Sequence, residues 1–492
     1  MTTFAQRCGL HNPIRQEQVT AAAAQIEARG IDLVRVTWCD LHGISRSKTL
    51  TARAAIHAMQ EGMGMVSTLM LKDTSDRTAF KVFEPGGTDA LPGFGQANNI
   101  ILLPDPSSLC ELPWSGGSGW LRAQPFFQDG TPVELDTRRV LERALAKLAQ
   151  AGYGMRCGLE VEFHIYRIKD ASIQLNPELA AWPGLPPEVE LIHPGYKLLS
   201  EDLYDMAEPA LRIVQHTAQS LGMPLSSLEL EFGPSQVEAV FDATDAMTAA
   251  DNMALFRNAV RMALRREGYH ATFVCRPPFP NIMSSGWHLH QSLVRLSDGA
   301  NVMMRENPAQ EAKPLDAAMT LSEVGEQWLA GLLRHARGMA SLCTPTVNGF
   351  GRYRPNALAP QSVLWGRDNR GAMLRVIGGC GDSATRIENR IGEPAANSYL
   401  YIAAQIHAGL DGIEQKLSAP PATESPYGVE GERLPTSLPE ALQALREDKA
   451  LVAGLGADFV SYFTQIKASE IARHEAAEDQ NDFQRREYFS RF

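Results

Sequence analysis

The sequence lacks the features that mark secreted, membrane-spanning and nucleic-acid-binding proteins. Its seven cysteines are odd in number, widely spaced and without a Cys-x-x-Cys pair, so a reducing compartment is expected. No apolar run reaches the roughly 18 residues of a membrane span, and Met1 to Leu10 contain no signal-peptide core, which indicates a cytoplasmic protein. The net charge of −11 offers no basic surface for nucleic acid.

Several signatures of catalysis are also missing. The chain has no His-Glu-x-x-His motif and no cysteine ligand set, which disfavours a zinc hydrolase. It has no Walker A loop and no kinase catalytic loop, which makes a kinase-like or ATP-grasp enzyme a weak alternative.

The composition is that of an ordinary globular protein, with 492 residues, 44% apolar and 21% charged. This length allows two or more domains. A stretch rich in glycine and proline over 108–133 predicts a boundary, with an N-terminal domain over 15–123 and a catalytic domain over 130–492. The patterns predict helices over 15–29, 52–60, 137–152 and most of 451–474, and strands over 33–38 and 44–50.

Two acidic segments stand out in the second part. Residues 155–168 alternate as a half-buried strand that carries Glu160 and Glu162 on its polar face. Residues 228–232 and 236–241 read as strands around a Gly233-Pro234 turn, with Glu231 and Glu238 near that turn. A solvated face would explain either segment alone. Taken together, the carboxylates of the two segments would repel one another unless a cation lies between them.

Two further segments add histidine and arginine. His288, His290 and Ser292 share one face of a predicted strand, and carboxylates with a single imidazole suit Mg²⁺ or Mn²⁺ better than Zn²⁺. A lone His-x-His is a weak signal for a metal site. Any one of the arginines in the last segment could instead form a surface salt bridge. The last segment supplies one more acid and four guanidinium groups that can bind phosphate or carboxylate, namely Arg370, Arg375, Arg386, Glu388 and Arg390. Together, the carboxylates, histidines and arginines of these segments indicate phosphoryl chemistry on a nucleotide.

These segments, in this order, resemble the glutamine synthetase family. The resemblance covers most of the chain, and its matching stretches are Gly158-Leu-Glu-Val-Glu162, Glu231-x-Gly-Pro-x-Gln-x-Glu238, Ser285-Gly-x-His-x-His-x-Ser292, Trp365-Gly-x-x-Asn-Arg370 and Arg386-Ile-Glu-x-Arg390. The resemblance implies an α+β fold, with a small β-grasp-like N-terminal domain and a large catalytic domain built on a curved antiparallel sheet and helices. It also implies a homo-oligomer, with a dodecamer of two stacked hexameric rings as the expected form.

The resemblance further implies a role for each matching residue. Two divalent cations, Mg²⁺ or Mn²⁺, would be held by Glu162, Glu231 and Glu238 and by Glu160, His288 and Glu388. Arg370 and Arg375 would face the phosphates of ATP, with His290 and Ser292 as further nucleotide contacts. Arg352 would hold the α-carboxylate of glutamate, and Arg390 would lie near the reacting carboxyl group. A catalytically inactive homologue is disfavoured because all six metal ligands are present.

The chain departs from ammonia-using members at the amine pocket. Val66 and Leu358 stand where the family places an aspartate and a glutamate around the ammonium ion. An apolar pocket gives an alkylammonium ion no partner, whereas an arylamine is neutral at pH 7. Ile282-Met283-Ser284 also replaces the Asn-Gly pair that often holds the amino end of glutamate.

The sequence therefore predicts an ATP-dependent ligase that joins the γ-carboxyl group of glutamate to an apolar amine. An aniline-like arylamine is favoured and a small alkylamine comes next. Glutamine synthetase using ammonium, or a γ-glutamyl-polyamine or ethanolamine ligase, are the alternatives. Four apolar residues are expected either to line the amine pocket or simply to pack in the core, namely Met63, Met65, Met70 and Trp287.

Overall fold

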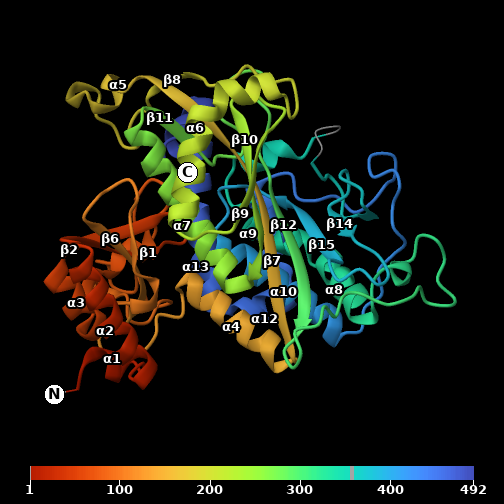
Figure 1. The fold of residues 1–492 in the computed structure, drawn as a ribbon, viewed down its shortest axis with the longest axis horizontal. Helices are drawn as coiled ribbons and strands as arrows, with labels where there is room; N and C mark the ends of the chain where they lie inside the picture. Colours follow the sequence, from red (N-terminus) through yellow and green to blue (C-terminus); the bar gives the residue numbers. More distant parts are fainter. Residues whose placement is uncertain (1, 355–358) are drawn as a thin grey trace.

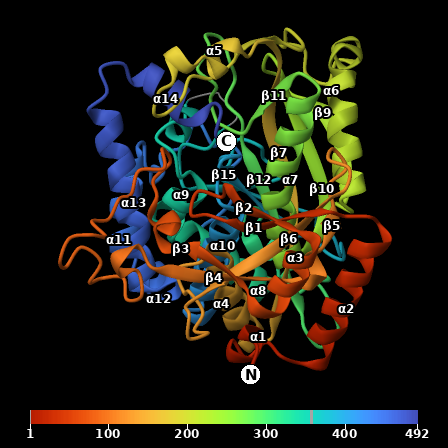
Figure 2. The same cartoon turned by 90° about the vertical axis from the view of Figure 1, so that its left-hand side faces the viewer.

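The computed structural model describes residues 2–354 and 359–492 (Figure 1). Within these ranges the strands form two sheets, one of six strands and one of nine. The smaller sheet comes from the first part of the chain and lies at one side of the molecule, with its helices facing outward (Figure 2). The larger sheet forms the centre of the remainder.

The smaller sheet has the strand order β2-β1-β6-β4-β3, with β5 beside β6. Its strands are β1 (Leu33–Cys39), β2 (Ser45–Thr51), β3 (Met63–Val66), β4 (Asn99–Pro104), β5 (Cys110–Glu111) and β6 (Ser118–Phe126). The helices α1 (Phe4–Arg7), α2 (Pro13–Ala28) and α3 (Ala52–Glu61) accompany it. The apolar stripe of α2, which includes Val19 and Ile26, packs with Met59 of α3 on Val34 and Leu121 of the sheet.

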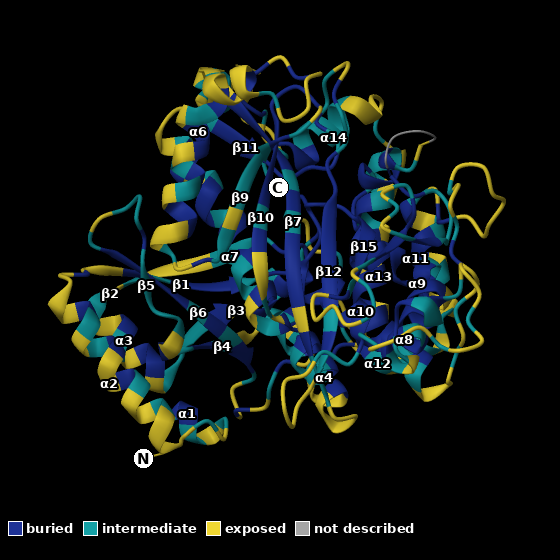
Figure 3. Ribbon diagram, turned by 45° about the vertical axis from the view of Figure 1, so that its right-hand side comes forward, coloured by how far each residue is buried: buried dark blue, intermediate teal, exposed yellow. Residues whose placement is uncertain are grey.

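The larger sheet has the order β13-β14-β15-β12-β7-β10-β9, with β8 and β11 also paired to β7. Its strands are β7 (Tyr153–Asp170), β8 (Glu188–Leu191), β9 (Leu225–Leu230), β10 (Gln236–Asp245), β11 (Tyr269–Thr272), β12 (Trp287–Arg295), β13 (Trp365–Arg367), β14 (Leu374–Ile377) and β15 (Arg386–Gly392). All its pairings are antiparallel except β13 with β14. The middle of β7 and the first halves of β10 and β12 are mostly buried (Figure 3).

Helices surround this sheet. They are α4 (Thr137–Gln150), α5 (Ser172–Leu175), α6 (Glu201–Ser220), α7 (Ala246–Arg266), α8 (Glu323–Arg334), α9 (Ala336–Cys343), α10 (Ser398–Glu414), α11 (Leu438–Glu447), α12 (Lys449–Leu455), α13 (Ala457–Glu475) and α14 (Gln480–Tyr488). The helix α10 is buried almost all round. It meets α8 backbone to backbone, because a Cβ atom on Gly331 would lie 2.2 Å from the carbonyl oxygen of Ala408, and one on Gly412 would lie 2.1 Å from that of Gln327.

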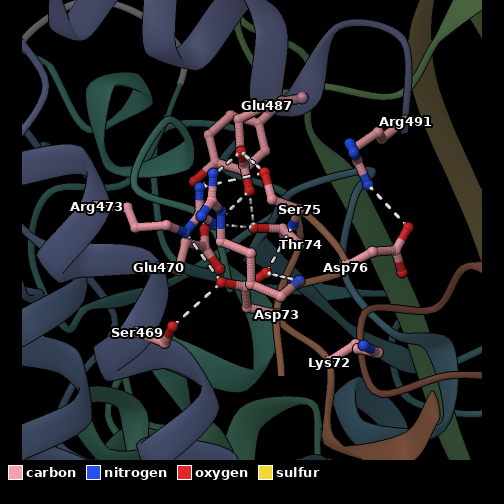
Figure 4. A network of polar contacts seen from close by, with 12 residues as sticks. Lys72, Asp73, Thr74, Ser75, Asp76, Ser469, Glu470, Arg473, Glu487 and Arg491 are labelled. Carbon is pink, nitrogen blue, oxygen red and sulfur yellow. Dashed lines mark hydrogen bonds and ion pairs between the residues drawn. The ribbon is translucent and has the colours of Figure 1, made fainter. Parts of the chain in front are cut away.

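A buried polar network ties the loop after β3 to the last two helices (Figure 4). Arg473 of α13 donates from Nε to Asp73 at 2.9 Å and from Nη2 to Glu487 of α14 at 2.7 Å. Both carboxylates have no exposed side-chain surface. Thr74 and Ser75 donate their hydroxyl protons to the same Glu487. Segments about 400 residues apart in sequence therefore share one set of charges.

These elements agree with the fold class expected from the sequence, a small sheet with helices and a larger antiparallel sheet with helices. The division into domains at 15–123 and 130–492 remains a prediction. Among the helices that the structure describes, none combines the length and apolarity needed to cross a membrane.

Candidate active site

The strand register of the larger sheet brings the acidic segments together. Directly opposed residues of antiparallel strands point to the same face, with Cβ atoms about 5 Å apart. Glu162 of β7 lies opposite Glu238 of β10, and Glu160 lies opposite His288 of β12. Farther along, Glu388 of β15 lies opposite His290 of β12. The alternation read from the sequence thus becomes one acidic face across four neighbouring strands.

Three sets of side chains on this face could each hold a metal ion, because the ligand atoms within each set lie within 4.8 Å of one another. The sets are Glu162 with Glu231 and Glu238, Glu160 with Glu238 and His288, and Glu160 with His290 and Glu388. The first set is the one expected from the sequence. Carboxylate oxygens with one imidazole suit a hard divalent cation such as Mg²⁺ or Mn²⁺.

The expected second set of Glu160, His288 and Glu388 is also in close contact. His288 Nδ1 lies 3.4 Å from Glu160 and 3.7 Å from Glu388. His290, which the sequence assigned to the nucleotide, approaches closer, with Nε2 2.9 Å from Glu160. Both imidazoles therefore lie within reach of a cation bound beside Glu160.

The protonation behaviour of the acids differs from one end of the cluster to the other. Burial and the nearby Glu162 raise the pKa of Glu231 and of Glu238. Burial alone would also raise the pKa of Glu388, but Arg390 and the two histidines hold it below its ordinary value. The end with Glu231 and Glu238 has excess negative charge that a cation would neutralise, which fits a metal site.

Arginines close the other end of the cluster. Arg375 Nη1 donates to Glu388 at 3.0 Å, and Arg390 Nη1 donates to the second oxygen of the same carboxylate. Arg375 also pairs with Asp368, a partner that the sequence did not indicate. Arg370 is exposed and lines a separate cavity of about 480 Å³ with Asp368.

Arg352 reaches the cluster from the loop after α9. Its Nη1 donates to the carbonyl oxygens of Arg390, at 2.8 Å, and Gly392, at 3.2 Å. Its Nη2 lies 3.4 Å from His288 Nε2. A Cβ atom at position 286 would lie 2.4 Å from that Nη2, so a side chain there would displace the guanidinium group.

A cavity of about 650 Å³ opens beside the cluster. His290 and Ser292, the two expected nucleotide contacts, line it together with Glu160. Arg386, one of the four arginines predicted to bind phosphate or carboxylate, also lines it and donates from Nε to His290 Nδ1 at 3.1 Å. Its apolar walls include Leu159 and Phe241. The cavity joins charged groups near the metal ligands to an apolar surface, as a nucleotide requires.

The structure describes two of the three residues expected at the amine pocket, Val66 and Trp287. Val66 is 37% exposed and lines another cavity, of about 710 Å³, in the smaller sheet. Among the described residues, none of those lining this cavity also lines the cavity beside the carboxylate cluster. Trp287 has no exposed surface and packs edge-on against Tyr401 at 4.9 Å, which is the core packing that the sequence also allowed. Leu358 lies outside the described residues.

Gln236 is a positioning residue that sequence patterns did not single out. Its Nε2 donates to Glu162 at 3.0 Å and to Ser285 Oγ at 3.1 Å, while its Oε1 accepts from the backbone of Gly233. It therefore fixes the turn between β9 and β10 against the segment that leads into β12. Its place within the Glu-x-Gly-Pro-x-Gln-x-Glu motif was the available signal.

Comparison with known proteins agrees with this geometry. The family model described as glutamine synthetase, catalytic domain, matches residues 134–486. A γ-glutamylanilide synthase of Acinetobacter sp. is 35% identical over 504 aligned positions, which cover 99% of this chain and 98% of the relative. A glutamine synthetase of Thermus thermophilus is 34% identical over 76% of this chain and 79% of the relative. A γ-glutamylethanolamide synthetase of Streptomyces coelicolor is 28% identical over 94% of each chain.

Solved structures give the same result. A GmaS/ADP complex superposes with a TM-score of 0.74 and 27% identity, covering 94% of this chain and 98% of the other. GmaS without ligand superposes with a TM-score of 0.75 and 27% identity, covering 93% and 97%. The similarity extends over both sheets.

Proposed function

The chain belongs to the glutamine synthetase family, whose members are ATP-dependent carboxylate–amine ligases, and we propose that it joins the γ-carboxyl group of glutamate to an apolar amine. An aniline-like arylamine is the favoured nucleophile and a small alkylamine follows. The single observation that carries the proposal is the face of clustered carboxylates, flanked by Arg375 and Arg390, beside the cavity lined by His290.

A carboxylate is a poor electrophile, so amide formation requires that its oxygen first becomes a good leaving group. Transfer of the γ-phosphoryl group of ATP to the carboxylate gives an acyl phosphate and ADP. The amine nitrogen then attacks the acyl carbon, the C–O bond to phosphate breaks, and the nitrogen loses a proton. The products are the γ-glutamyl amide, ADP and phosphate.

The side chains of this chain bind and orient the two charged reactants. Glu162, Glu231 and Glu238 would hold one divalent cation, and Glu160, Glu388 and the histidines a second. When bound, these cations neutralise negative charge on the phosphates. Because Glu388 fixes Arg375 and Arg390, their remaining N–H groups would face the moving phosphoryl group and the reacting carboxyl group.

Two nucleotide contacts follow from the cavity beside the cluster. His290 and Ser292 lie on its wall, and Arg386 holds the imidazole of His290 through its Nε–H. We assign ATP to this cavity, with its phosphates toward Glu160. Arg370 would reach the phosphates from its exposed position.

The preference for an apolar amine rests on Val66 and Leu358, which replace two acids of ammonia-using relatives. Without a carboxylate, an alkylammonium ion would lose its hydration without gaining a partner, whereas aniline is neutral. The full-length similarity to a γ-glutamylanilide synthase supports this preference. The similarity to a γ-glutamylethanolamide synthetase supports a polar amine such as ethanolamine as the alternative to an apolar one.

Val66 can line an amine pocket only if another copy of the chain contributes it, because it lies apart from the carboxylate cluster of its own chain. We therefore propose a homo-oligomer, with a dodecamer of two hexameric rings as the expected form. Light scattering coupled to size exclusion tests this proposal, and an active monomer would contradict it.

The experiment that tests the function supplies ATP, Mg²⁺ and glutamate and compares phosphate release with ammonium, isopropylamine, putrescine and aniline. We expect the highest kcat/KM with aniline and detection of the γ-glutamyl anilide by mass spectrometry. The highest kcat/KM with ammonium would contradict the proposed amine class. Reactions without glutamate are the control for simple ATP hydrolysis.

A further inference from the structure

Gln405 is a polar residue in the middle of α10, a helix that is buried almost all round. Its side chain has no exposed surface. Its Oε1 accepts a hydrogen bond from Gln291 Nε2 of β12 at 3.1 Å and another from Asn389 Nδ2 of β15 at 2.8 Å. A buried amide is unfavourable unless it is hydrogen-bonded, and these two bonds join the helix to two strands of the larger sheet.

The direction of these hydrogen bonds follows from two groups that can only donate. Trp328 Nε1 of α8 donates to Gln291 Oε1 at 2.9 Å, and the backbone N of Ile391 donates to Asn389 Oδ1 at 3.1 Å. Both amides therefore turn their NH₂ groups toward Gln405, whose oxygen has to face them. Gln405 Oε1 is thus the shared acceptor of two strands, which an apolar side chain could not be.

The two strands that Gln405 joins carry the candidate site on their other face. Successive residues of a strand point to opposite faces of the sheet. Gln291 follows His290 on β12, and Asn389 follows Glu388 on β15. His290 and Glu388 lie opposite each other in the ladder between these strands. The amides therefore lie directly behind two of the residues that could hold a cation.

The pairing of β12 with β15 is irregular beside Asn389. Trp287 lies opposite Gly392 and Leu289 lies opposite Asn389, so β15 has one residue more than β12 over this stretch. Such a β-bulge leaves a backbone group without its ladder partner and changes the direction of nearby side chains. Asn389 Oδ1 accepts from the backbone N of Ile391 within the bulge. The bulge therefore depends on how the side chain of Asn389 is held.

A second residue of α10 contacts the same bulge. Tyr401 lies one turn before Gln405 and on the same side of the helix. Its hydroxyl group donates to the carbonyl oxygens of Asn389, at 3.2 Å, and of Trp287, at 3.4 Å. Arg390 follows Asn389 directly and lies within the bulge. The helix thus fixes the backbone from which Arg390 projects toward the site.

We propose that Gln405 is a positioning residue of the reaction. Through Gln291 and Asn389 it holds β12 and β15 in the register that brings His290 and Glu388 together, and so it sets the geometry with which the site binds ATP and its divalent cation. The inference rests on the proposed function in that this end of the cluster binds the nucleotide. Because Gln405 lies behind the sheet, its loss should weaken nucleotide binding without changing which amine is preferred.

The first test measures, by calorimetry below the thermal midpoint of each protein, the dissociation constant of the non-hydrolysable ATP analogue adenylyl imidodiphosphate in the presence of Mg²⁺. Gln405→Met keeps the length of the side chain and removes the shared acceptor. We expect the dissociation constant to rise about 10- to 100-fold, as when a residue that orients metal ligands is lost. The ratio of kcat/KM for aniline to that for isopropylamine should not change.

Gln405→Glu should recover most of the affinity. A buried carboxyl group remains protonated, so its carbonyl oxygen can accept from Gln291 and Asn389. Its O–H group would take the place of the NH₂ group of Gln405, which faces the sulfur atoms of Met339 at 3.1 Å and Cys343 at 3.7 Å. Recovery in Gln405→Glu would show that the acceptor, rather than the packing, is what matters.

Tyr401→Phe tests the same contacts without removing a buried amide. It deletes one hydroxyl group and keeps the aromatic ring, so the protein should fold even where Gln405→Met does not. We expect a smaller rise in the dissociation constant of the analogue than in Gln405→Met. An unchanged dissociation constant in both Tyr401→Phe and the folded variants of Gln405 would contradict the inference.

The matched control is His407→Met, which changes another buried polar residue of α10. The imidazole of His407 packs against Gly454 of α12, where a Cβ atom would lie 2.5 Å from the ring, and no hydrogen bond joins the ring to another described residue. This variant should bind the analogue as the wild type does. An equal loss of affinity in His407→Met, or a Gln405→Met that only lowers the thermal midpoint, would show a purely structural role.

Nucleotide binding is measured without amide formation, which separates this inference from the proposed function. A wild type that forms no γ-glutamyl amide but binds the analogue, with weaker binding in Gln405→Met, would remove the function and keep the inference. A wild type that forms the amide while Gln405→Met binds the analogue equally would do the reverse. A wild type that does not bind the analogue would overturn both.

Discussion

Glu388 illustrates how the position of one residue on a strand decides its chemistry. Its side chain is fully buried, yet Arg375 and Arg390 each donate to one of its oxygens, so its pKa stays below the ordinary value. Glu238 is almost as buried but faces other carboxylates, and its pKa is raised. The protein thus neutralises one end of the cluster and leaves the other for a cation.

Glu238→Gln removes one negative charge from the acidic end of the cluster. We expect the Mg²⁺ concentration for half-maximal phosphate release to rise by about tenfold or more, because a ligand is lost. Without metal, the thermal midpoint of the variant should equal or exceed that of the wild type, since one buried repulsion disappears.

The matched control for this change is Glu229→Gln. Glu229 lies opposite Glu238 on β9 but belongs to none of the three close sets. An unchanged Mg²⁺ dependence in Glu238→Gln, or an equal change in Glu229→Gln, would contradict the assignment.

Leu358→Glu restores an acid that ammonia-using relatives carry. Leu358 lies outside the described residues, so the prediction rests on the sequence alone. We expect the ratio of kcat/KM for aniline to that for ammonium to fall at least about tenfold, because a carboxylate stabilises the ammonium ion. Leu358→Gln, which adds polarity without charge, should produce a smaller fall. Equal ratios in all three proteins would show that this position does not select the amine.

At the scale of residues, the sequence was informative where spacing reflects strand geometry. Glu160, Glu162 and Glu238 were found because period-two alternation places them on one face. Arg386 was predicted only as one of four arginines able to bind phosphate or carboxylate, because nothing in the pattern shows which of them contacts a histidine. Its contact with His290 becomes visible only when β12 and β15 are placed in three dimensions.

At the scale of elements, long amphipathic segments were predicted well. The helices expected over 15–29 and 137–152 are Pro13–Ala28 and Thr137–Gln150, and the strand over 155–168 is Tyr153–Asp170. The helix expected over most of 451–474 is interrupted, because Gly456 adopts a φ of +97° between α12 and α13. The strand expected to include Glu231 ends at Leu230, so Glu231 lies in the turn that follows.

Arg473→Ala would leave Asp73 and Glu487 buried without a cation. Loss of one partner from a buried ion network destabilises a protein by about 3–5 kcal/mol, and we expect a loss of that size in urea unfolding. The triple variant Arg473→Met, Asp73→Asn, Glu487→Gln should recover part of it. The surface pair Arg212 with Glu208 on α6 provides the control Arg212→Ala, which should have little effect. A loss no larger than in this control would contradict a structural role of the network.

His335, at the junction of α8 and α9, contacts one aspartate on α10 and another between α11 and α12, and these contacts predict a pH dependence. Its Nδ1 lies 2.7 Å from Asp448 and its Nε2 2.9 Å from Asp411. Burial alone would lower the pKa of His335, but the two aspartates raise it above the ordinary 6.5. The charged form therefore stabilises the fold below that value, and this stabilisation is lost as the pH rises through the folded-state pKa.

The comparison of wild type with His335→Gln tests this dependence. The free energy of unfolding of the wild type should decline relative to that of the variant as the pH rises above about 6.5, the ordinary pKa of histidine. Parallel curves across that range would show that the aspartates do not stabilise the imidazolium ion.

At the scale of the whole molecule, the two sheets carry different candidate site residues. The buried charges around Arg473 connect the loop after β3, in the first part of the chain, to α13 and α14. The larger sheet presents the carboxylate face, and the smaller one carries Val66 at the exposed edge of its own cavity. Sequence motifs predicted the carboxylate cluster of the larger sheet, because all of its members belong to one chain. Val66 lines a separate cavity, and its proposed role requires an assembly of copies that periodicity in one chain does not encode.

The central claim is that this molecule activates a carboxylate by phosphorylation before an apolar amine attacks it. The direct measurement uses glutamate labelled with oxygen-18 in its γ-carboxyl group, together with ATP, Mg²⁺ and aniline, and analyses the released phosphate by mass spectrometry. The account predicts one labelled oxygen in each phosphate released and an equal amount of γ-glutamyl anilide. Phosphate without label, released while the anilide forms, would contradict it.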